Sequence, residues 1–285
     1  MSGSAGEDWS QWIGRSEQAL DNIAAGRAQA LQATLDDAQP PLHPGDVLPP
    51  LWHWAYFWSL APTAGLGPDG HAARGEFLPP IDLPRRMWAG SRVAFPRPLE
   101  VGSEVTRLST IKSVSEKAGR SGRLAFVTVE HVVSDSEGPC IVEEHDIVYR
   151  EAAEKGATLP PGEAPPTLSG WYREVVPSPV LLFRYSALTF NGHRIHFDHP
   201  YTTEEEGYPG LIVHGPLLAT MMIGQLRREL PQARVSSFVF RAKRPIFDVR
   251  PFRVCGAPDT AASRADLWVV DPDGYLAMQG EVNWA

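Results

Sequence analysis

Apolar positions recur at helical spacing near the start of the chain. In residues 7–37, alanine and leucine repeat at three- and four-residue intervals, which predicts a helix. The prolines and glycine within residues 40–45 end this pattern. A second apolar stretch, residues 48–60, contains Pro49 and Pro50 near its start. Because proline favours the first turn of a helix, this stretch predicts a second helix.

Between residues 92 and 149 the pattern changes to short stretches rich in β-branched residues. Turn-forming segments separate these stretches, which predicts consecutive antiparallel strands. An apolar helix pattern returns at residues 216–230, and further strand patterns fill residues 234–284. The same order of helix and strands therefore occurs twice. We predict an α+β fold in which a duplicated unit places a helix against a curved antiparallel sheet.

The two predicted units are separated by a segment of different composition. Residues 152–177 hold several prolines and small residues, which is typical of a linker. We therefore predict an N-terminal domain at residues 1–151 and a C-terminal domain at residues 178–285.

The composition excludes several classes of protein. A net charge of -8 argues against a general nucleic-acid-binding surface, which needs a basic excess. The chain has no run of eighteen apolar residues, and its first residues lack the layout of a signal peptide. We therefore expect a cytoplasmic protein without membrane spans. Cys140 and Cys255 lie far apart without metal or redox spacing, which predicts buried thiols.

The densest group of ionisable residues lies in residues 191–199. About fifteen residues later, the turn His214-Gly215-Pro216 precedes the apolar helix. A cluster of bases followed by backbone donors at a helix N-terminus suits a carbonyl that gains negative charge during a reaction. The ionisable side chains of this block are His193, His196, Asp198 and His199.

Two sequence motifs carry a resemblance to a known family. Residues 185–198 read YSALTFNGHRIHFD, and residues 207–222 read GYPGLIVHGPLLATMM. In these motifs the chain resembles double hotdog-fold, MaoC-like acyl-CoA hydratases that have an N-terminal FAS1-like dehydratase region. That group includes itaconyl-CoA and mesaconyl-CoA hydratases and mitochondrial 3-hydroxyacyl-thioester dehydratases. The resemblance implies a double hotdog fold with a non-catalytic first domain and a catalytic second domain.

The resemblance also implies roles for four residues. His196 matches the catalytic histidine of the wider family, and Gly215 matches the glycine whose N–H faces the thioester oxygen. Asn191 stands where the wider family has a catalytic aspartate, and His193 where it has asparagine. An amide cannot take up a proton as a carboxylate does, so Asn191 is expected to hold the attacking water only. His196 is expected to exchange the proton of that water. His193 is either a second acid–base group or an orienting group.

Basic residues are candidates for binding the substrate. Arginine forks suit the phosphates of coenzyme A and free carboxylates, although a solvated strand edge is an equally good explanation. If the acyl group carries a free carboxylate, Arg85 or Arg86 is expected to meet it. The full set of candidate substrate-binding residues is Arg85, Arg86, His214, Arg241, Lys243 and Arg244.

The expected activity is the reversible hydration of an α,β-unsaturated acyl-CoA, with itaconyl-CoA or mesaconyl-CoA giving citramalyl-CoA. Dehydration of linear 3-hydroxyacyl thioesters and acyl-CoA binding without catalysis stay open as alternatives. A thioesterase is disfavoured because residues 216–226 offer no carboxylate on the helix. No cofactor is expected beyond the coenzyme A of the substrate.

A metal site built from the histidines and aspartate of residues 191–199 is disfavoured. The block lacks a His-x-x-x-His helix, and Pro200 follows it directly. We therefore expect no metal. A double hotdog chain already contains one pair of sheets, so a monomer could hold a complete site, and a homodimer stays open.

Overall fold

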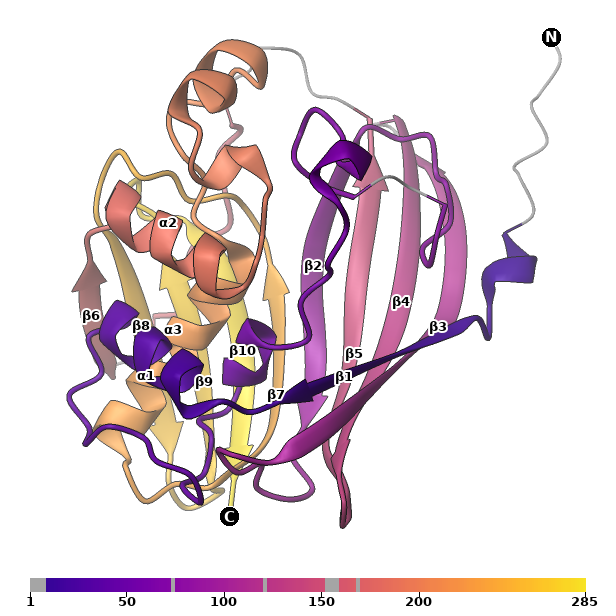
Figure 1. Cartoon of the computed structure of the whole chain (residues 1–285). Helices are drawn as coiled ribbons and strands as arrows, with labels where there is room; N and C mark the ends of the chain where they lie inside the picture. Colours follow the sequence, from indigo (N-terminus) through magenta and orange to yellow (C-terminus); the bar gives the residue numbers. More distant parts are fainter. Residues whose placement is uncertain (1–8, 73–74, 120–121, 152–158, 168–169) are drawn as a thin grey trace, which may run out of the picture.

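In the part of the chain that the structure describes, ten strands form one antiparallel sheet (Figure 1). The computed structural model describes residues 9–72, 75–119, 122–151, 159–167 and 170–285. The strands of the first half are β1 (Ser16–Asn22), β2 (Arg85–Ala94), β3 (Glu104–Gly119), β4 (Gly122–Asp135) and β5 (Gly138–Arg150). Those of the second half are β6 (Trp171–Val175), β7 (Val235–Ala242), β8 (Phe252–Asp259), β9 (Arg264–Val270) and β10 (Leu276–Trp284).

The strand order shows the duplication directly. It runs β1-β3-β4-β5-β2-β7-β10-β9-β8-β6. Counted from its outer edge, the second half follows the order β6-β8-β9-β10-β7, which repeats β1-β3-β4-β5-β2 of the first half. The halves join where β2 pairs with β7, from Gly90↔Arg241 to Ala94↔Ser237. The predicted α+β fold with a duplicated unit is therefore confirmed.

The predicted helices of the first half are wrong in their extent. The structure replaces the expected helix at residues 7–37 by strand β1 and the shorter helix α1 (Ala25–Thr34), with residues 7 and 8 outside the described part. Pairing of β1 with β3 outweighs the local helical pattern, because the edge of the sheet supplies partners for its backbone groups.

The apolar stretch at residues 48–60 contains only a 3-10 turn at Trp52–Ala55. Leu51 and Phe57, which flank this turn, have left-handed backbones with φ of 72° and 56°. A right-handed helix cannot continue through such residues. The prediction of a long second helix was therefore wrong.

The predicted linker also differs from the structure. Its residues 171–175 form β6, which pairs with β8 and so belongs to the sheet of the second half. Earlier in the same segment, the N–H of Leu276 donates to the carbonyl of Glu163 at 2.8 Å. Residues 152–158 and 168–169 of the segment lie outside the described residues.

The helices of the second half follow the sequence pattern. Helix α2 (Pro179–Leu188) begins with Ser178, whose side chain accepts a hydrogen bond from the Leu181 N–H at 3.2 Å. Helix α3 (Gly215–Glu229) packs on the second-half sheet with a largely buried surface. Figure 1 shows α1, α2 and α3 gathered over the second-half strands. Within the described residues, no helix has the length and apolar character needed to cross a membrane.

One large core joins the two halves, and smaller clusters complete it. The main cluster includes residues of α3, β7 and β10 together with residues of α1 and β2. A second cluster lies within the first half under β3, β4 and β5. Cys140 and Cys255 are both unpaired and buried, as predicted. Because the main core crosses the β2–β7 junction, side chains of the first half can reach residues 191–216 of the second.

Candidate active site

His196 ends a short 3-10 turn, Arg194–His196, and is buried with 8% of its surface exposed. Its Nδ1 lies 2.7 Å from the carbonyl oxygen of Ile212. A carbonyl can only accept a hydrogen bond, so Nδ1 carries the proton and Nε2 carries the lone pair. Burial lowers the pKa of His196 to about 4. At neutral pH this side chain is therefore an uncharged base with Nε2 as its basic atom.

The ring of His214 stacks against the ring of His196 and supports it. The two rings are stacked, with centroids 3.7 Å apart. His214 is fully buried, and its Nε2 lies 2.8 Å from the hydroxyl of Ser186 on α2. Its predicted contact with substrate is therefore disfavoured, because packing and a hydrogen bond hold its side chain inside the protein.

Gly215 is the first residue of α3, so its N–H has no acceptor within the helix. The positive end of the helix dipole strengthens this donor toward a developing negative charge. A Cβ added at Gly215 would have Cε3 of Trp88 as its nearest neighbour, at 4.0 Å. Trp88 belongs to β2, so the first half supplies a wall of this site.

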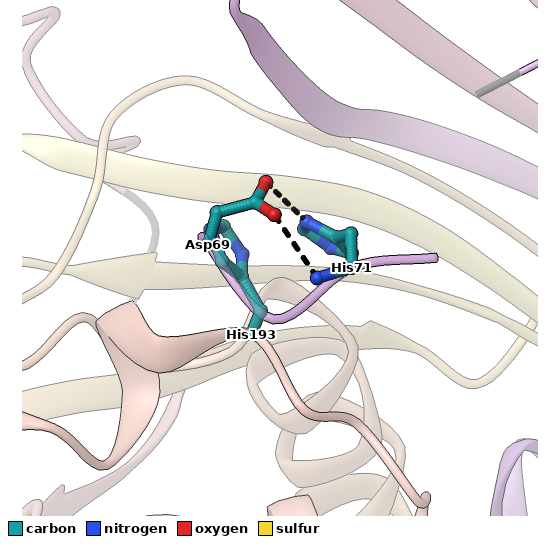
Figure 2. Close-up of side chains that lie close together, drawn as sticks. All are labelled: Asp69, His71 and His193. Carbon is teal, nitrogen blue, oxygen red and sulfur yellow. Dashed lines mark hydrogen bonds and ion pairs between the residues drawn. The ribbon is translucent and has the colours of Figure 1, made fainter. Parts of the chain in front are cut away.

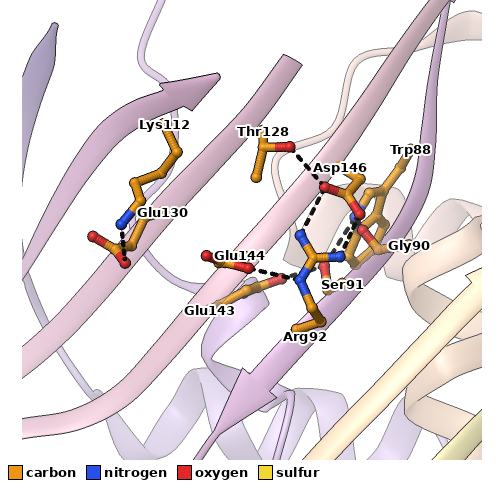
Figure 3. A network of polar contacts seen from close by, with 10 residues as sticks. All are labelled: Trp88, Gly90, Ser91, Arg92, Lys112, Thr128, Glu130, Glu143, Glu144 and Asp146. Atoms are coloured by element: carbon orange, nitrogen blue, oxygen red, sulfur yellow. Dashed lines mark hydrogen bonds and ion pairs between the residues drawn. The ribbon is translucent and has the colours of Figure 1, made fainter. Parts of the chain in front are cut away.

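A polar network holds Trp88 in place (Figure 3). Its indole N–H lies 3.1 Å from the hydroxyl of Ser91, which donates to Glu143 at 2.7 Å. Glu143 is buried and also accepts from the indole of Trp54 at 2.9 Å and contacts His53 at 3.2 Å. His53 is itself buried and packs against Trp54, with ring centroids 5.5 Å apart.

Asn191 and His193 lie between α2 and His196. The side-chain oxygen of Asn191 accepts from the main-chain N–H of His193 at 3.0 Å. Its amide nitrogen is then the group suited to donate toward a water. The rings of His193 and His196 are nearly perpendicular, with centroids 5.5 Å apart. Burial, followed by the nearby His71, lowers the pKa of His193, so this side chain is also uncharged at neutral pH.

Two residues of the first half that the sequence analysis missed lie against His193 (Figure 2). His71 packs on His193 with ring centroids 4.0 Å apart, and its Nδ1 lies 2.9 Å from the carboxylate of Asp69. The hydrogen bond with His71 holds the pKa of Asp69 well below its usual range. The Asp-Gly-His sequence at 69–71 was the available signal, but nothing local relates it to a site more than 120 residues away.

The four side chains considered for a metal site do not converge. Asp198 pairs with Arg194 at 2.8 Å and accepts a hydrogen bond from the Tyr201 N–H at 3.2 Å, so its carboxylate is already engaged. His199 is exposed. In the described part of the chain, donor atoms of Asp69, His71 and His193 do lie within 4.8 Å of one another. The hydrogen bond between Asp69 and His71 accounts for that spacing without an ion.

Arg85 and Arg86 differ in their surroundings. Arg85 forms an ion pair with Glu206 at 3.4 Å, and its guanidinium lies 5.0 Å from the ring centroid of Tyr208. Arg86 is half-buried, and its charge acts on both His145 and His193, whose pKa values it helps to lower. Arg86 therefore acts electrostatically on His193, whereas Arg85 acts on Glu206 and Tyr208.

The remaining basic candidates are Arg241, Lys243 and Arg244, and two of them already pair with acidic residues. Lys243 pairs with Glu163 at 3.1 Å, and Arg244 pairs with Asp271 at 2.9 Å. Arg241 neighbours the buried Phe240 along β7 and is exposed on the opposite face of the sheet. On that face, Arg241 and Asp146 both line a cavity of about 390 Å³. Binding of coenzyme A by these three residues stays a prediction. Lys243 and Arg244 would have to give up their ion pairs with Glu163 and Asp271 to bind its phosphates.

Comparison with known proteins gives a consistent picture. The family model described as hydroxyacyl-thioester dehydratase type 2 matches residues 51–248. The chain is 48% identical to mesaconyl-C(4)-CoA hydratase of Chloroflexus aurantiacus over 96% of this chain and 97% of the relative. It is 28% identical to the mitochondrial hydroxyacyl-thioester dehydratase type 2 of Schizosaccharomyces pombe over 92% and 94% of the two chains.

Comparison with solved structures identifies the fold. A solved protein of Mycobacterium tuberculosis described as having a double hotdog fold superposes with a TM-score of 0.57, at 12% identity, over 96% of both chains. This confirms the double hotdog architecture. The family model and the relative from Chloroflexus aurantiacus, rather than the fold, relate this site to hydratases and dehydratases that act on acyl thioesters.

Proposed function

We propose that this chain, which belongs to the hydroxyacyl-thioester dehydratase type 2 family, hydrates a branched, unsaturated dicarboxylyl-CoA. Mesaconyl-CoA linked through its C4 carboxyl is the first candidate, with citramalyl-CoA as its product. The relative from Chloroflexus aurantiacus, similar over nearly the whole chain, supports this substrate. The observation that carries the proposal is the uncharged His196, with its Nε2 lone pair, in a segment that leads into the Gly215 N–H.

The chemistry follows from these groups. Water attacks Cβ while Nε2 of His196 takes its proton, and the electrons of the double bond move to the thioester oxygen. The Gly215 N–H stabilises the resulting enolate at the positive end of α3. Protonation of Cα completes the hydration. In the reverse direction, protonated His196 donates to the leaving hydroxyl.

The position of the double bond separates the two branched candidates. In the C4 thioester of mesaconate the double bond is conjugated with the thioester, so attack at Cβ gives the enolate directly. In itaconyl-CoA linked through C4 the double bond is one carbon farther from the thioester. A proton shift must then precede the same addition. Itaconyl-CoA is therefore the second candidate.

Arg86 is proposed to meet the free carboxylate of the acyl group. In the mesaconyl group this carboxylate is attached to Cβ, so it lies beside the attacking water and the histidines. Arg86 acts electrostatically on His193, whereas Arg85 is already paired with Glu206. Exchange of Arg86 for Gln should lower turnover of mesaconyl-CoA much more than that of crotonyl-CoA, which has no free carboxylate. The matched variant Arg85→Gln should not discriminate between them, and equal losses from Arg86→Gln on both substrates would refute this role.

Dehydration of linear 3-hydroxyacyl thioesters is the second candidate function. The relative from Schizosaccharomyces pombe supports it, at a lower identity of 28%.

A substrate panel tests these proposals together. Purified protein is incubated with mesaconyl-C4-CoA, itaconyl-CoA, crotonyl-CoA and a long 2-enoyl-CoA, and product mass and thiol release are followed. Gain of one water on mesaconyl-C4-CoA without thiol release supports the proposed function. Gain of water on linear thioesters alone supports the second candidate. Release of thiol indicates a thioesterase, and no change on any substrate supports acyl-CoA binding without catalysis.

A further inference from the structure

Residues 66–72 of the first half dock on the catalytic segment through their backbone. The main-chain N–H of Arg194 donates to the carbonyl of Asp69 at 2.9 Å, and its guanidinium donates to the carbonyl of Pro68 at 3.0 Å. A Cβ added at Gly70 would lie 1.9 Å from the carbonyl oxygen of Gly192. The lack of side chains at this contact allows the two backbones to approach closely. The loop is therefore fixed against the residues on both sides of His193.

This docking brings a carboxylate next to the histidines. Asp69 accepts from the main-chain N–H of His71 at 3.0 Å and contacts its Nδ1 at 2.9 Å. An ionised carboxylate only accepts, so Nδ1 of His71 carries a proton, and Nε2 is the atom that can gain or lose a second proton. A carboxylate at this distance fixes the tautomer of an imidazole and stabilises its protonated form. By contrast, the acceptor for Nδ1 of His196 is the uncharged carbonyl of Ile212.

The rings form a row that ends on this carboxylate. His196 lies 5.5 Å from His193, and His193 lies 4.0 Å from His71, between ring centroids. Other charges act on the row as well: Arg86 acts on His193, and Asp69 acts on Tyr201. Asn191 occupies the position between α2 and His193 but cannot store a proton.

We propose that Asp69 and His71 form the second acid–base unit of the active site and act through His193. The inference rests on the proposed hydratase function. His71, paired with ionised Asp69, holds the proton that becomes attached to Cα. His193 passes this proton on and stays uncharged, whereas His196 receives the proton of the attacking water. Asp69 and His71 are thus positioning residues of the first half, which also supplies the Trp88 wall.

The proton balance of this scheme is closed. The O–H bond of water breaks as the O–Cβ bond forms, and His196 takes that proton. The enolate returns its electron pair to Cα, which forms a C–H bond with a proton from His193. In the same step, the other ring nitrogen of His193 accepts a proton from Nε2 of His71, so His193 stays uncharged. His71 ends uncharged and His196 charged, and exchange with solvent restores both before the next turnover.

The test compares wild-type protein with Asp69→Asn and His71→Gln, using the acyl-CoA that wild-type protein hydrates. Both variants should lower kcat by about a hundredfold, in the range of general acid–base catalysis, with KM changed by less than about threefold. His71→Gln should remove the decline of kcat at high pH, since in this scheme the decline reports loss of a proton from His71. Asp69→Asn keeps His71 without its carboxylate and should move the decline to lower pH. The matched control His43→Gln replaces an exposed histidine of the first half and should leave both quantities unchanged.

Two further measurements separate this inference from others. Nitrogen NMR of the His71 ring should show a proton on Nδ1 in wild-type protein, and this result does not depend on any activity. A His71 ring whose Nδ1 carries no proton would overturn the proposal, as would wild-type kcat and pH profile in both variants. Stoichiometric metal in purified protein, with activity abolished by chelation, would assign the cluster to an ion and also overturn it. Wild-type protein that hydrates no acyl-CoA would instead refute the proposed function.

Discussion

The imidazole rings of His196 and His214 lie nearly parallel, with centroids 3.7 Å apart and 18° between their planes. The hydroxyl of Ser186, on α2, fixes the second ring at 2.8 Å. His196, the proposed base, is therefore held by its hydrogen bond to the carbonyl of Ile212 and by the ring of His214. The ring of His214 is in turn fixed by Ser186 of α2.

The first prediction concerns this support. Exchange of Ser186 for Ala leaves His214 without its buried partner, so the stacked ring should lose its fixed orientation. We expect kcat to fall about tenfold, the lower range for loss of an orienting group behind a reacting residue. The control Ser178→Ala removes the N-cap of the same helix and should cost about 1 kcal/mol of stability with an unchanged kcat. Steady-state kinetics and urea unfolding of both variants measure these effects. Equal kcat values for Ser186→Ala and Ser178→Ala would contradict a role of His214 in orienting His196.

The second prediction concerns the base itself. Exchange of His196 for Gln retains a polar side chain but removes the lone pair that takes up the proton. Turnover should fall by about a hundredfold or more, as expected for loss of a general base. His199→Gln is the matched control, because His199 is exposed three residues away. A folded His196→Gln variant with near-normal kcat would remove this residue from the mechanism.

Gly215 gives the third prediction. A Cβ at this position would stand 4.0 Å from Trp88, so Gly215→Ala should fold normally but obstruct the approach of the thioester oxygen to the N–H. Loss of an oxyanion donor costs about 10²–10³ in kcat, which sets the scale of the expected decrease. In the same helix, Gly224 has no atom within 4 Å of an added Cβ. Gly224→Ala should therefore stabilise the protein by about 0.5–1 kcal/mol and leave kcat unchanged. Thermal unfolding and steady-state kinetics of Gly215→Ala and Gly224→Ala measure both effects. Similar kcat values for the two variants would argue against the Gly215 N–H as the oxyanion donor.

The junction of the halves gives the fourth prediction. Gly70 and Gly14 have similar positive φ angles, 88° and 85°, so Ala should strain both backbones by about 1–2 kcal/mol. Only at Gly70 would the new Cβ collide with the neighbouring backbone, since Gly14 has open space. Gly70→Ala should therefore also displace residues 66–72 and lower kcat. If the two variants have the same kcat, docking of this loop is unnecessary for activity.

The fifth prediction concerns acid stability. Burial lowers the pKa of His131 to about 3 and of His145 and His196 to about 4, below the value of about 6.5 for unfolded chains. As pH falls from 6.5 toward 4, the unfolded chain binds protons that the folded chain does not. The stability present above pH 6.5 is then lost, by up to about 1.4 kcal/mol per pH unit for each histidine.

Urea midpoints at pH 7.5, 6.0 and 5.0 measure this loss. His145→Gln should reduce the pH dependence because it removes one of the three histidines. His43→Gln, at an exposed position, should leave it unchanged. A urea midpoint that does not change between pH 7.5 and 5.0 would show that these histidines are not buried in their uncharged form.

The sequence by itself determined the catalytic segment and the order of the elements. Residues 191–199 and 214–216 are close in sequence, and the start of α3 at Gly215 follows from local chain chemistry, so a motif could identify both. The repeated order of strands was also visible, because alternation of apolar residues is a local property. Domain boundaries and the roles of the site residues stay predictions.

Only the tertiary structure decided how the first half contributes. The pairing of β2 with β7 places Trp88 over Gly215, and docking of residues 66–72 places Asp69 and His71 against His193. These contacts join residues more than 100 positions apart, and no local pattern encodes them. The same limitation explains the missed strand β1 and the short turn at Trp52–Ala55, where long-range pairing and left-handed residues outweighed helical spacing. Local pattern determined which residues could react, and packing between the halves determined which residues surround them.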